Sequence, residues 1–530
     1  MWLIDTKNLK LHDRVEIPRY AILSHTWGQE EVTFKDMTSP TRFLKKGYAK
    51  IVRTCRLARE QGLDFAWIDT CCIDKSSSAE LNESINSMFR WYQNAEVCYV
   101  FLSDLVLPVK NMGACRWFTR GWTLQELLAP RKLEFYDSEW GRLGSKDDFI
   151  DIISEATRIP RAVLAHRQPI KDCSVAARMA WAASRNTTRI EDEAYCLLGI
   201  FDVHMPLIYG EGRQSFRRLQ EEIVKRNSDL TIFAWDTPPH LLSANRLFDL
   251  FAESPAAFTR CPGVVPFRDD FAEFAVTNKG LLLSGGIPLR ALVKPNQQRH
   301  CEIYGLFLGH DSHAGGVFLR KIAPGLFARD GGFELAGIRQ DVKANRLLKN
   351  TPDFHILTDV SSSTHVLFSV FRKDALRVPV QQGIQLVDAV PESLWDIGDR
   401  LFLRPKPYTW YKNPMALALS FKAVIARTKV KFIVLCDYRG DKPICRVFTP
   451  EQHPREAQML FEPANRELSI PIADLEKQNT ELLVLKDNVK VPANNQWWKL
   501  TVSLEKETVK GLILEFEAFN LILSVTPVIS

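Results

Sequence analysis

Short apolar runs alternate with segments of helical period between residues 20 and 136, and this alternation constrains the fold most strongly. Residues 20–24, 65–69, 97–102 and 133–136 form four apolar runs of strand length. Residues 48–58 and 81–92 carry apolar side chains at helical spacing, and a short helix is expected at residues 122–128. Strands without polar alternation are buried on both faces, so the pattern predicts a doubly wound parallel sheet covered by helices.

Two local signals mark the ends of these helices. Gly62 follows the first helix where a left-handed C-terminal cap is favoured. Glu80 and Glu83 lie in the first turn of the second helix, where the helix dipole stabilises acidic side chains.

The character of the sequence changes near residue 236, where Asp236-Thr-Pro-Pro-His interrupts the alternation. Beyond it, β-branched and aromatic runs separated by turn residues predict an antiparallel, sandwich-like region. The expected strands are residues 275–283, 301–308, 354–358, 366–371, 431–435 and 498–503. We therefore divide the chain into an α/β module at 1–140, a helical extension at 141–236 and a β-rich accessory region of unknown function at 237–530.

Charge and cysteine usage exclude several classes of protein. The 69 Lys and Arg against 63 Asp and Glu form no basic cluster, which argues against a nucleic-acid partner. The N-terminus lacks the features of a signal peptide, and no apolar run reaches the roughly 18 residues that a membrane span needs. Eleven cysteines, an odd number, do not form a disulfide framework. These features predict a cytoplasmic protein without a membrane span.

Motifs of the common cofactor and metal enzymes are missing from the sequence. It contains no G-x-G-x-x-G after the first strand and no P-loop, which argues against a redox dinucleotide enzyme and an NTPase. Neither H-E-x-x-H nor zinc-spaced C-x-x-C pairs occur, so we expect no metal and no bound cofactor. G-x-S-x-G and the local signatures of caspases and papain-like proteases are absent too.

Three polar clusters fall at or near the ends of the predicted strands. Their sequences are Ser-His-Thr-Trp-Gly at 24–28, Trp-Ile-Asp-Thr-Cys-Cys-Ile-Asp at 67–74 and Phe-Thr-Arg-Gly-Trp-Thr-Leu-Gln-Glu at 118–126. The carboxyl ends of parallel strands share one edge of a sheet, where ligands bind in doubly wound folds. We therefore expect the three clusters to meet in one crevice.

These clusters resemble the three signature blocks of the fungal heterokaryon incompatibility (HET) domain. The matching segments of this sequence are LSHTWG, WIDTCCID and RGWTLQE. The resemblance covers residues 18–135, and residues 189–212 are similar to the sequence that follows this domain in many fungal proteins. It implies a function in fungal non-self recognition, in which activation leads to growth arrest or programmed cell death. It also implies other HET-type or receptor-type proteins as partners, and self-association on activation.

The HET domain is in turn similar to the TIR domain, which implies a flavodoxin-like sheet. Some TIR domains hydrolyse NAD with a glutamate in a Trp-x-x-x-Glu pattern, and Trp122 and Glu126 reproduce that spacing. The resemblance makes Glu126 the candidate catalytic residue and NAD the candidate substrate. A carboxylate can stabilise the oxocarbenium-like transition state as nicotinamide leaves, and nicotinamide needs no protonation.

The candidate binding residues are polar or aromatic members of the three blocks. The hydroxyl and imidazole groups suit phosphate or ribose oxygens, the indoles suit stacking, and the guanidinium suits phosphate. They are Ser24, His25, Trp27, Asp69, Arg120 and Trp122. We expect Glu126 to face an open crevice lined by Ser24, His25 and Asp69.

Each candidate also has a structural interpretation. Asp69 is as well suited to pairing with Arg120 as to binding a ligand, and Trp122 suits helix packing. Cys71 and Cys72 are interpreted as small buried residues, since no base lies near them in sequence. A structural Glu126 would leave the domain a non-catalytic signalling and oligomerisation scaffold, which is the alternative to an NAD glycohydrolase.

Overall fold

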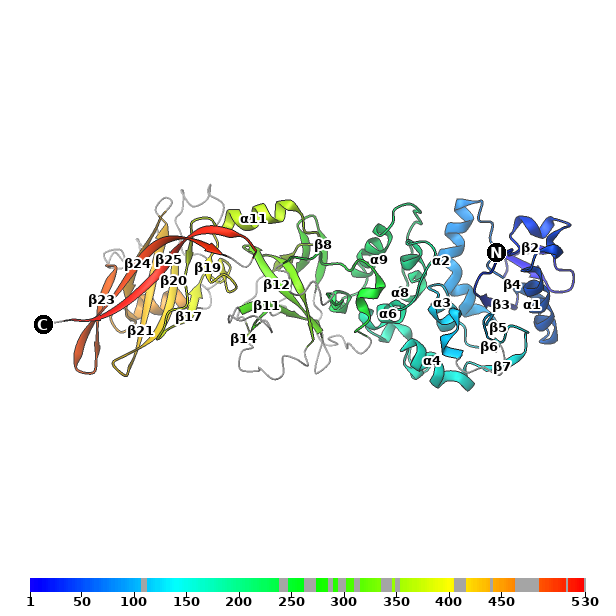
Figure 1. The fold of residues 1–530 in the computed structure, drawn as a ribbon, viewed down its shortest axis with the longest axis horizontal. Coiled ribbons are helices and arrows are strands. Elements are labelled where there is room, and N and C mark those ends of the chain that lie inside the picture. The colour runs from blue at the N-terminus through cyan, green and yellow to red at the C-terminus, as the bar shows by residue number, and fades with distance from the viewer. Residues whose placement is uncertain are drawn as a thin grey trace. The chain divides into compact units, whose positions relative to one another are not determined.

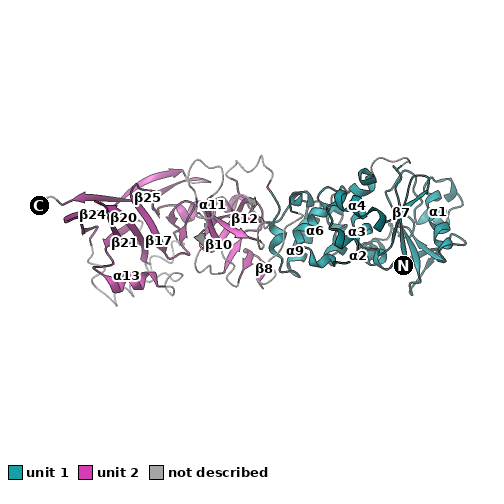
Figure 2. Cartoon of the chain, turned by 90° about the horizontal axis from the view of Figure 1, so that it is seen from below, with its two compact units in different colours: residues 1–236, 251–268, 309–314 teal, residues 237–250, 269–308, 315–530 magenta. Residues whose placement is uncertain are grey.

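The computed structural model describes residues 1–105, 112–237, 246–261, 273–284, 289–293, 302–308, 315–334, 346–347, 353–404, 416–438, 442–462, 486–510 and 513–528. The chain divides into two compact units (Figure 2). Unit 1 comprises residues 1–236, 251–268 and 309–314, and unit 2 comprises residues 237–250, 269–308 and 315–530.

A mixed sheet forms the N-terminal part of unit 1 (Figure 1). Its strands are β1 (Trp2–Asp5), β2 (Leu11–Asp13), β3 (Tyr20–His25), β4 (Phe65–Trp67), β5 (Val97–Phe101), β6 (Leu133–Tyr136) and β7 (Arg142–Ser145). They follow the order β2-β1-β4-β3-β5-β6-β7. The four central strands β4, β3, β5 and β6 are parallel, whereas β1, β2 and β7 pair antiparallel at the edges. The expected parallel strands are confirmed, and the short edge strands are additions that the sequence did not reveal.

The helices α1 (Tyr48–Glu60), α2 (Ser78–Asn94) and α3 (Thr123–Leu128) connect the parallel strands as expected. Gly62 has φ +74°, a left-handed conformation that glycine adopts without strain, directly after α1. Ser77 caps α2, since its side chain accepts a hydrogen bond from the backbone N–H of Glu80. The end of α1 and the start of α2 are therefore each set by a neighbouring residue in the sequence.

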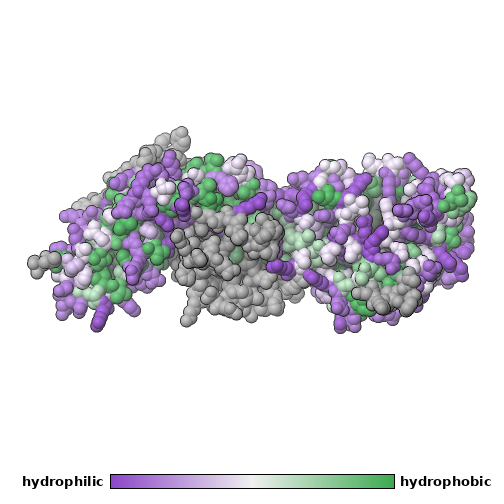
Figure 3. Space-filling model, in the orientation of Figure 1, coloured by the Kyte–Doolittle hydropathy of each residue, from purple (hydrophilic) through white to green (hydrophobic). Residues whose placement is uncertain are grey.

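The rest of unit 1 is mainly helical. It contains α4 (Ile150–Thr157), α5 (Arg161–Leu164), α6 (Val175–Ala182), α7 (Asp192–Tyr195), α8 (Leu198–Phe201) and α9 (Gln214–Val224). Short 3-10 helices occur in unit 1 at Lys35–Thr38, Arg42–Leu44, Met112–Ala114, Arg116–Thr119, Asp147–Phe149, Ile170–Asp172, Leu230–Phe233 and Pro255–Phe258. Every residue of α6 is buried, so this helix forms part of the core. Figure 3 shows hydrophilic residues over much of the visible face of unit 1, with apolar residues scattered between them.

Unit 2 is rich in β-structure, as expected, but its described residues form three sheets rather than the two of a simple sandwich. The first has the order β14-β10-β11-β12-β13-β15-β9-β8, the second β18-β19-β16-β25-β24-β23 and the third β17-β20-β21-β22. The strands are β8 (Phe274–Thr277), β9 (Gly280–Leu283), β10 (Leu289–Val293), β11 (Glu302–Phe307), β12 (Gly315–Ala323), β13 (Leu326–Glu334), β14 (Arg346–Leu347), β15 (Phe354–Ile356), β16 (Ala375–Arg377), β17 (Ile384–Val390), β18 (Trp395–Asp396), β19 (Leu401–Phe402), β20 (Ala416–Ile425), β21 (Thr428–Tyr438), β22 (Pro443–Phe448), β23 (Asn488–Ala493), β24 (Gln496–Lys510) and β25 (Glu515–Pro527).

Two expectations for unit 2 are wrong in detail. Residues 366–371 lie in helix α11 (Ser362–Arg372) and not in a strand. A capping box between Ser361 and Thr364 starts this helix, and its buried residues Thr364, Phe368 and Phe371 recur at helical spacing. The run at 275–283 is a hairpin of β8 and β9, because the chain turns before Gly280, whose φ is +130°. A second helix, α13 (Pro454–Phe461), follows β22.

A buried charge cluster fixes the end of α11. The guanidinium of Arg372 is fully buried and donates hydrogen bonds to the carboxylates of Asp396 and Asp399, at 2.7 Å for Asp399. Buried ion pairs of this kind are costly to break, because one charge would stay unpaired in a low-dielectric interior.

Candidate functional site

The first two sequence blocks meet where the strand order reverses. The chain passes from β3 to its neighbour β4 on one side and then to β5 on the other side of β3. Ser24 and His25 are the last residues of β3, and Asp69 follows two residues after the end of β4. The loop after β5 leads to α3, which carries Glu126 from the third block. This is the position that doubly wound sheets use for ligands.

Glu126 belongs to a buried hydrogen-bond network. Its carboxyl Oε2 accepts a hydrogen bond of 2.5 Å from the hydroxyl of Ser24. The Ser24 hydroxyl in turn accepts one of 2.7 Å from the indole N–H of Trp117. The hydroxyl of Tyr92 is hydrogen-bonded to the same carboxyl and lies 3.1 Å from the carbonyl of Leu23. Only 6% of Glu126 is exposed and Ser24 is fully buried, so the network is sealed from solvent.

Burial controls the protonation of Glu126. It raises the pKa of this carboxyl from its ordinary 4.5 to about 8, and repulsion from Asp69 acts in the same direction. Hydrogen bonds from Ser24 and Tyr92 and the charge of Arg185 oppose this shift without cancelling it. At neutral pH the side chain is therefore mainly a neutral acid. In that form it can donate to the Tyr92 oxygen while Tyr92 donates to the backbone.

A second cluster lies beside the network and reaches the surface. Asp69 accepts a hydrogen bond of 2.7 Å from the indole N–H of Trp27, and its other oxygen lies 3.2 Å from His25 Nε2. Burial opposes the ionisation of Asp69, but its hydrogen bonds and the nearby cations outweigh it and lower the pKa of Asp69. Trp27 is 46% exposed, and the ammonium of Lys75 lies 3.6 Å from its ring centroid. On the other side of the imidazole, Lys50 Nζ lies 2.9 Å from His25 Nδ1.

The predicted site residues therefore fall into separate groups. Ser24 joins Glu126, whereas His25, Trp27 and Asp69 form the neighbouring cluster. The expectation that Glu126 faces an open crevice is wrong, because its side chain is buried and hydrogen-bonded to the hydroxyls of Ser24 and Tyr92.

Arg120 and Trp122 make their contacts elsewhere. The guanidinium of Arg120 donates to Thr188 Oγ1 at 3.1 Å, so the suggested pairing with Asp69 is not the contact that the structure shows. Trp122 is hydrogen-bonded to the buried carboxyl of Asp192 in α7. Both side chains thus attach the start of α3 to residues 186–192.

Gly121 allows the chain to pass close to that segment. Its backbone N–H donates to the carbonyl of Asn186 at 3.0 Å, and a Cβ at this position would lie 2.5 Å from Thr187 Cγ2. Close packing therefore explains why the third block has glycine at position 121.

Three residues that act on the Glu126 network were not among the predicted site residues. Tyr92 is hydrogen-bonded to Glu126, Trp117 donates to its partner Ser24, and Arg185 acts through its charge. Trp117 adjoins the third block, and this position is the only signal that the sequence offered. Arg185 is buried, and its Nη1 donates to the carbonyl of Arg120 and to Thr123 Oγ1, both at 2.9 Å. It holds the first turn of α3, and no local pattern marks it.

Cys71 and Cys72 are buried, as expected. Their mutual hydrogen bond and burial raise the pKa of the Cys71 thiol well above its ordinary value. A thiol that resists ionisation is a poor nucleophile.

No group of three or more His, Cys, Asp or Glu among the described residues is placed to hold a metal ion. No helix among these residues is long and apolar enough to cross a membrane.

Known proteins are similar to parts of this chain. Residues 20–108 match the family model "Heterokaryon incompatibility protein (HET)", and residues 214–262 match "Domain of unknown function (DUF8212)". Over 238 residues the chain is 48% identical to vegetative incompatibility protein HET-E-1 of Podospora anserina, and the alignment covers 42% of this chain and 18% of that protein. No solved structure matches. The first two blocks lie within the matched family range, whereas Glu126 lies beyond it.

Proposed function

We propose, from the premise that unit 1 contains a heterokaryon incompatibility domain, that this protein acts in fungal vegetative incompatibility and that its activation leads to cell death. The observation that carries this proposal is the 48% identity to an incompatibility protein over 238 residues. Because this chain spans less than a fifth of that protein, we base the proposal on the shared domain alone. A cytoplasmic location and contact with other HET-type or receptor-type proteins are part of the proposal.

We infer that the HET domain works as a non-catalytic signalling scaffold that self-associates on activation. The sealed carboxyl of Glu126 supports this mechanism, since a neutral acid without solvent access cannot stabilise a developing cation on a substrate. In this view Glu126 joins α3 to β3 and α2 through Ser24 and Tyr92. The exposed indole of Trp27, with Lys75 over its ring, offers a surface for protein contact.

NAD hydrolysis at a TIR-like site is the second candidate. Two observations favour it: the strongly raised pKa of Glu126, which is common at active sites, and its position behind the strand ends. The reaction requires the network to open so that Glu126 ionises and faces the ribose. Water then adds to the ribose carbon as the bond to nicotinamide breaks, and one proton is released. Trp27, His25 and Arg120 would contact the dinucleotide in this open form.

The two mechanisms are distinguished by expressing the full chain in yeast and measuring growth and cellular NAD. We compare the wild type with Glu126→Gln and with Glu155→Gln, a control at an exposed position of α4. The scaffold predicts growth arrest with unchanged NAD in all three proteins. NAD loss that disappears only in Glu126→Gln would establish hydrolysis instead. Normal growth with abundant wild-type protein, alone and with a HET-type partner, would refute the cell-death function.

A further inference from the structure

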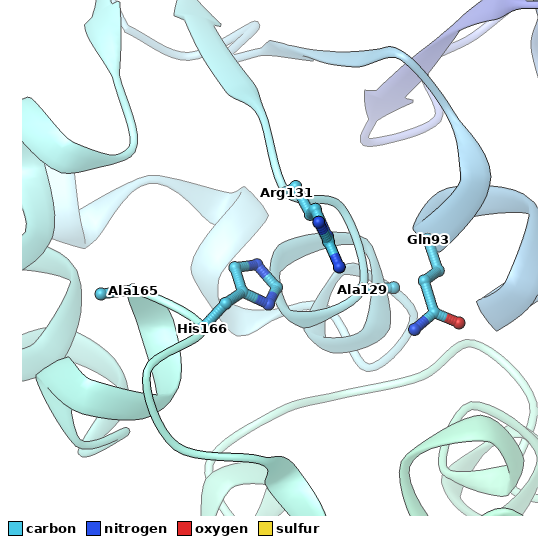
Figure 4. A pocket seen from close by; sticks show the side chains of 5 residues that line it. All are labelled: Gln93, Ala129, Arg131, Ala165 and His166. Carbon is cyan, nitrogen blue, oxygen red and sulfur yellow. The ribbon is translucent and has the colours of Figure 1, made fainter.

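Unit 1 contains a solvent-open cavity that none of the sequence blocks predicted. Its volume is about 480 Å³, and it is lined by Gln93, Ala129, Arg131, Ala165 and His166 (Figure 4). Pockets of a few hundred Å³ accommodate small organic ligands.

The cavity lies at the opposite edge of the parallel sheet from the first two sequence blocks. Gln93 is near the C-terminal end of α2, just before β5 begins, and residues 129–131 directly precede β6. These are the amino ends of two parallel strands, whereas His25 and Asp69 lie at the carboxyl ends of β3 and β4. The lining of the cavity therefore shares no residue with the Glu126 network.

The polar groups of the lining are hydrogen-bond donors. Figure 4 shows the side chains of Gln93, Arg131 and His166 reaching toward a common space from three different segments. They supply an amide NH₂, a guanidinium fork and an imidazole, and none of the five lining residues is acidic. Ala129 and Ala165 add small apolar walls.

One ring nitrogen of His166 is already occupied by neighbours. The buried Lys146 Nζ lies 2.9 Å from His166 Nε2 and 3.2 Å from the carbonyl of Pro130. The Pro130 carbonyl itself lies 2.9 Å from Nε2. Nε2 is therefore engaged inside the protein, and Nδ1 is the nitrogen that a ligand would meet.

Nearby groups lower the pKa of the imidazole. Partial burial lowers the pKa of His166, and the positive charges of Lys146 and Arg131 lower it further, while the hydrogen bond to the Pro130 carbonyl and the charge of Asp147 oppose them. Burial also lowers the pKa of Lys146 to about 8. Two cations and one carboxylate, that of Asp147, thus lie within electrostatic range of the imidazole, so positive charge predominates around it.

We propose that this cavity binds the phosphate dianion of a small phosphomonoester. The Arg131 fork would donate to phosphate oxygens, His166 would donate from Nδ1 after taking up a proton, and the Gln93 amide would complete the set. The space beside Ala129 and Ala165 holds the organic part of the ligand. Two nearby cations match the two negative charges of the phosphate better than the single charge of a carboxylate.

Isothermal titration calorimetry of the full chain tests this proposal, with inorganic phosphate, AMP and acetate as probes at equal ionic strength. We expect binding of phosphate and tighter binding of AMP, without measurable binding of acetate. Arg131→Gln and His166→Asn should each weaken AMP binding about tenfold or more, because each removes a charge-assisted or direct hydrogen bond. Asparagine is chosen because His166 has φ +52°, a left-handed conformation that asparagine tolerates. Arg53→Gln, at an exposed position of α1, should bind as the wild type does.

A second readout reports the charge of the site. A bound dianion should raise the pKa values of His166 and Lys146, so binding near pH 7.5 should take up protons and its heat should depend on the buffer. Failure of phosphate and AMP to bind, or unchanged binding by Arg131→Gln, would overturn the proposal. These results are independent of growth arrest in yeast, so this site and the incompatibility function can fail separately.

Discussion

Replacing Glu126 with glutamine should make the stability of this protein less dependent on pH. The glutamine amide has the shape of the neutral acid and can accept the hydrogen bond from Ser24, while its NH₂ group replaces the acid proton. The variant therefore keeps the network in the protonation state that the wild type has at neutral pH.

The magnitude follows from the shift in the pKa of Glu126. Its folded-state pKa of about 8 exceeds the unfolded value of 4.5, so between these pH values the folded state holds a proton that the unfolded state has lost. The free energy of unfolding of the wild type consequently falls as pH rises, by at most 1.36 kcal/mol per pH unit, and the glutamine variant lacks this contribution. Between pH 5 and pH 8, the variant should gain about 3 kcal/mol relative to the wild type.

Urea unfolding of the full chain at pH 5, 6, 7 and 8 measures this difference. Tryptophan fluorescence is a suitable signal, since nine of the thirteen tryptophans lie within residues 1–236. The control Glu155→Gln is exposed, and its difference from the wild type should stay within about 0.5 kcal/mol at every pH. The reasoning is refuted if the difference between Glu126→Gln and the wild type is the same at pH 5 and pH 8. If the Glu126→Gln variant is folded at pH 7, a loss of NAD hydrolysis in it cannot be attributed to unfolding.

Three further substitutions test packing inside the units, two in unit 1 and one in unit 2. Ser24→Ala removes the donor to the buried carboxyl and the acceptor of an indole N–H, and should lower the free energy of unfolding by about 1–3 kcal/mol in urea titrations. Gly121→Ala should cost about 1–3 kcal/mol, because its Cβ would overlap Thr187, whereas Gly28→Ala meets its nearest atom at an ordinary 3.5 Å and serves as a matched control. Arg372→Met removes the buried guanidinium that pairs with Asp396 and Asp399, so hydrogen exchange in unit 2 should report a loss of about 3–5 kcal/mol; unchanged protection there would contradict this assignment.

Much of the α/β region could be predicted because its signals are local. The strand at β3 and the helix α1 follow from apolar periodicity, and Gly62 marks the end of α1 without reference to the rest of the chain. The edge strands β1 and β2 escaped prediction, since they are short and depend on pairing with β4 and with each other.

Local signals predicted a strand where the structure has the helix α11. Its sequence is rich in β-branched and aromatic residues, which favour strands by propensity. The capping box and the buried face formed by Phe368 and Phe371 decide for a helix, because packing against the sheet outweighs local preference.

The candidate site also has a part that the sequence predicts and a part that depends on tertiary packing. The sequence by itself determined that Ser24, His25 and Asp69 would lie near one another, since the carboxyl ends of parallel strands share an edge. Only the tertiary structure decided that Glu126 is sealed, because the hydroxyl that binds it is 102 residues away in sequence and the indole that completes the network is 93 residues from that hydroxyl. The protonation of a carboxyl depends on the polarity of everything around it, and that environment exists only once distant segments have packed.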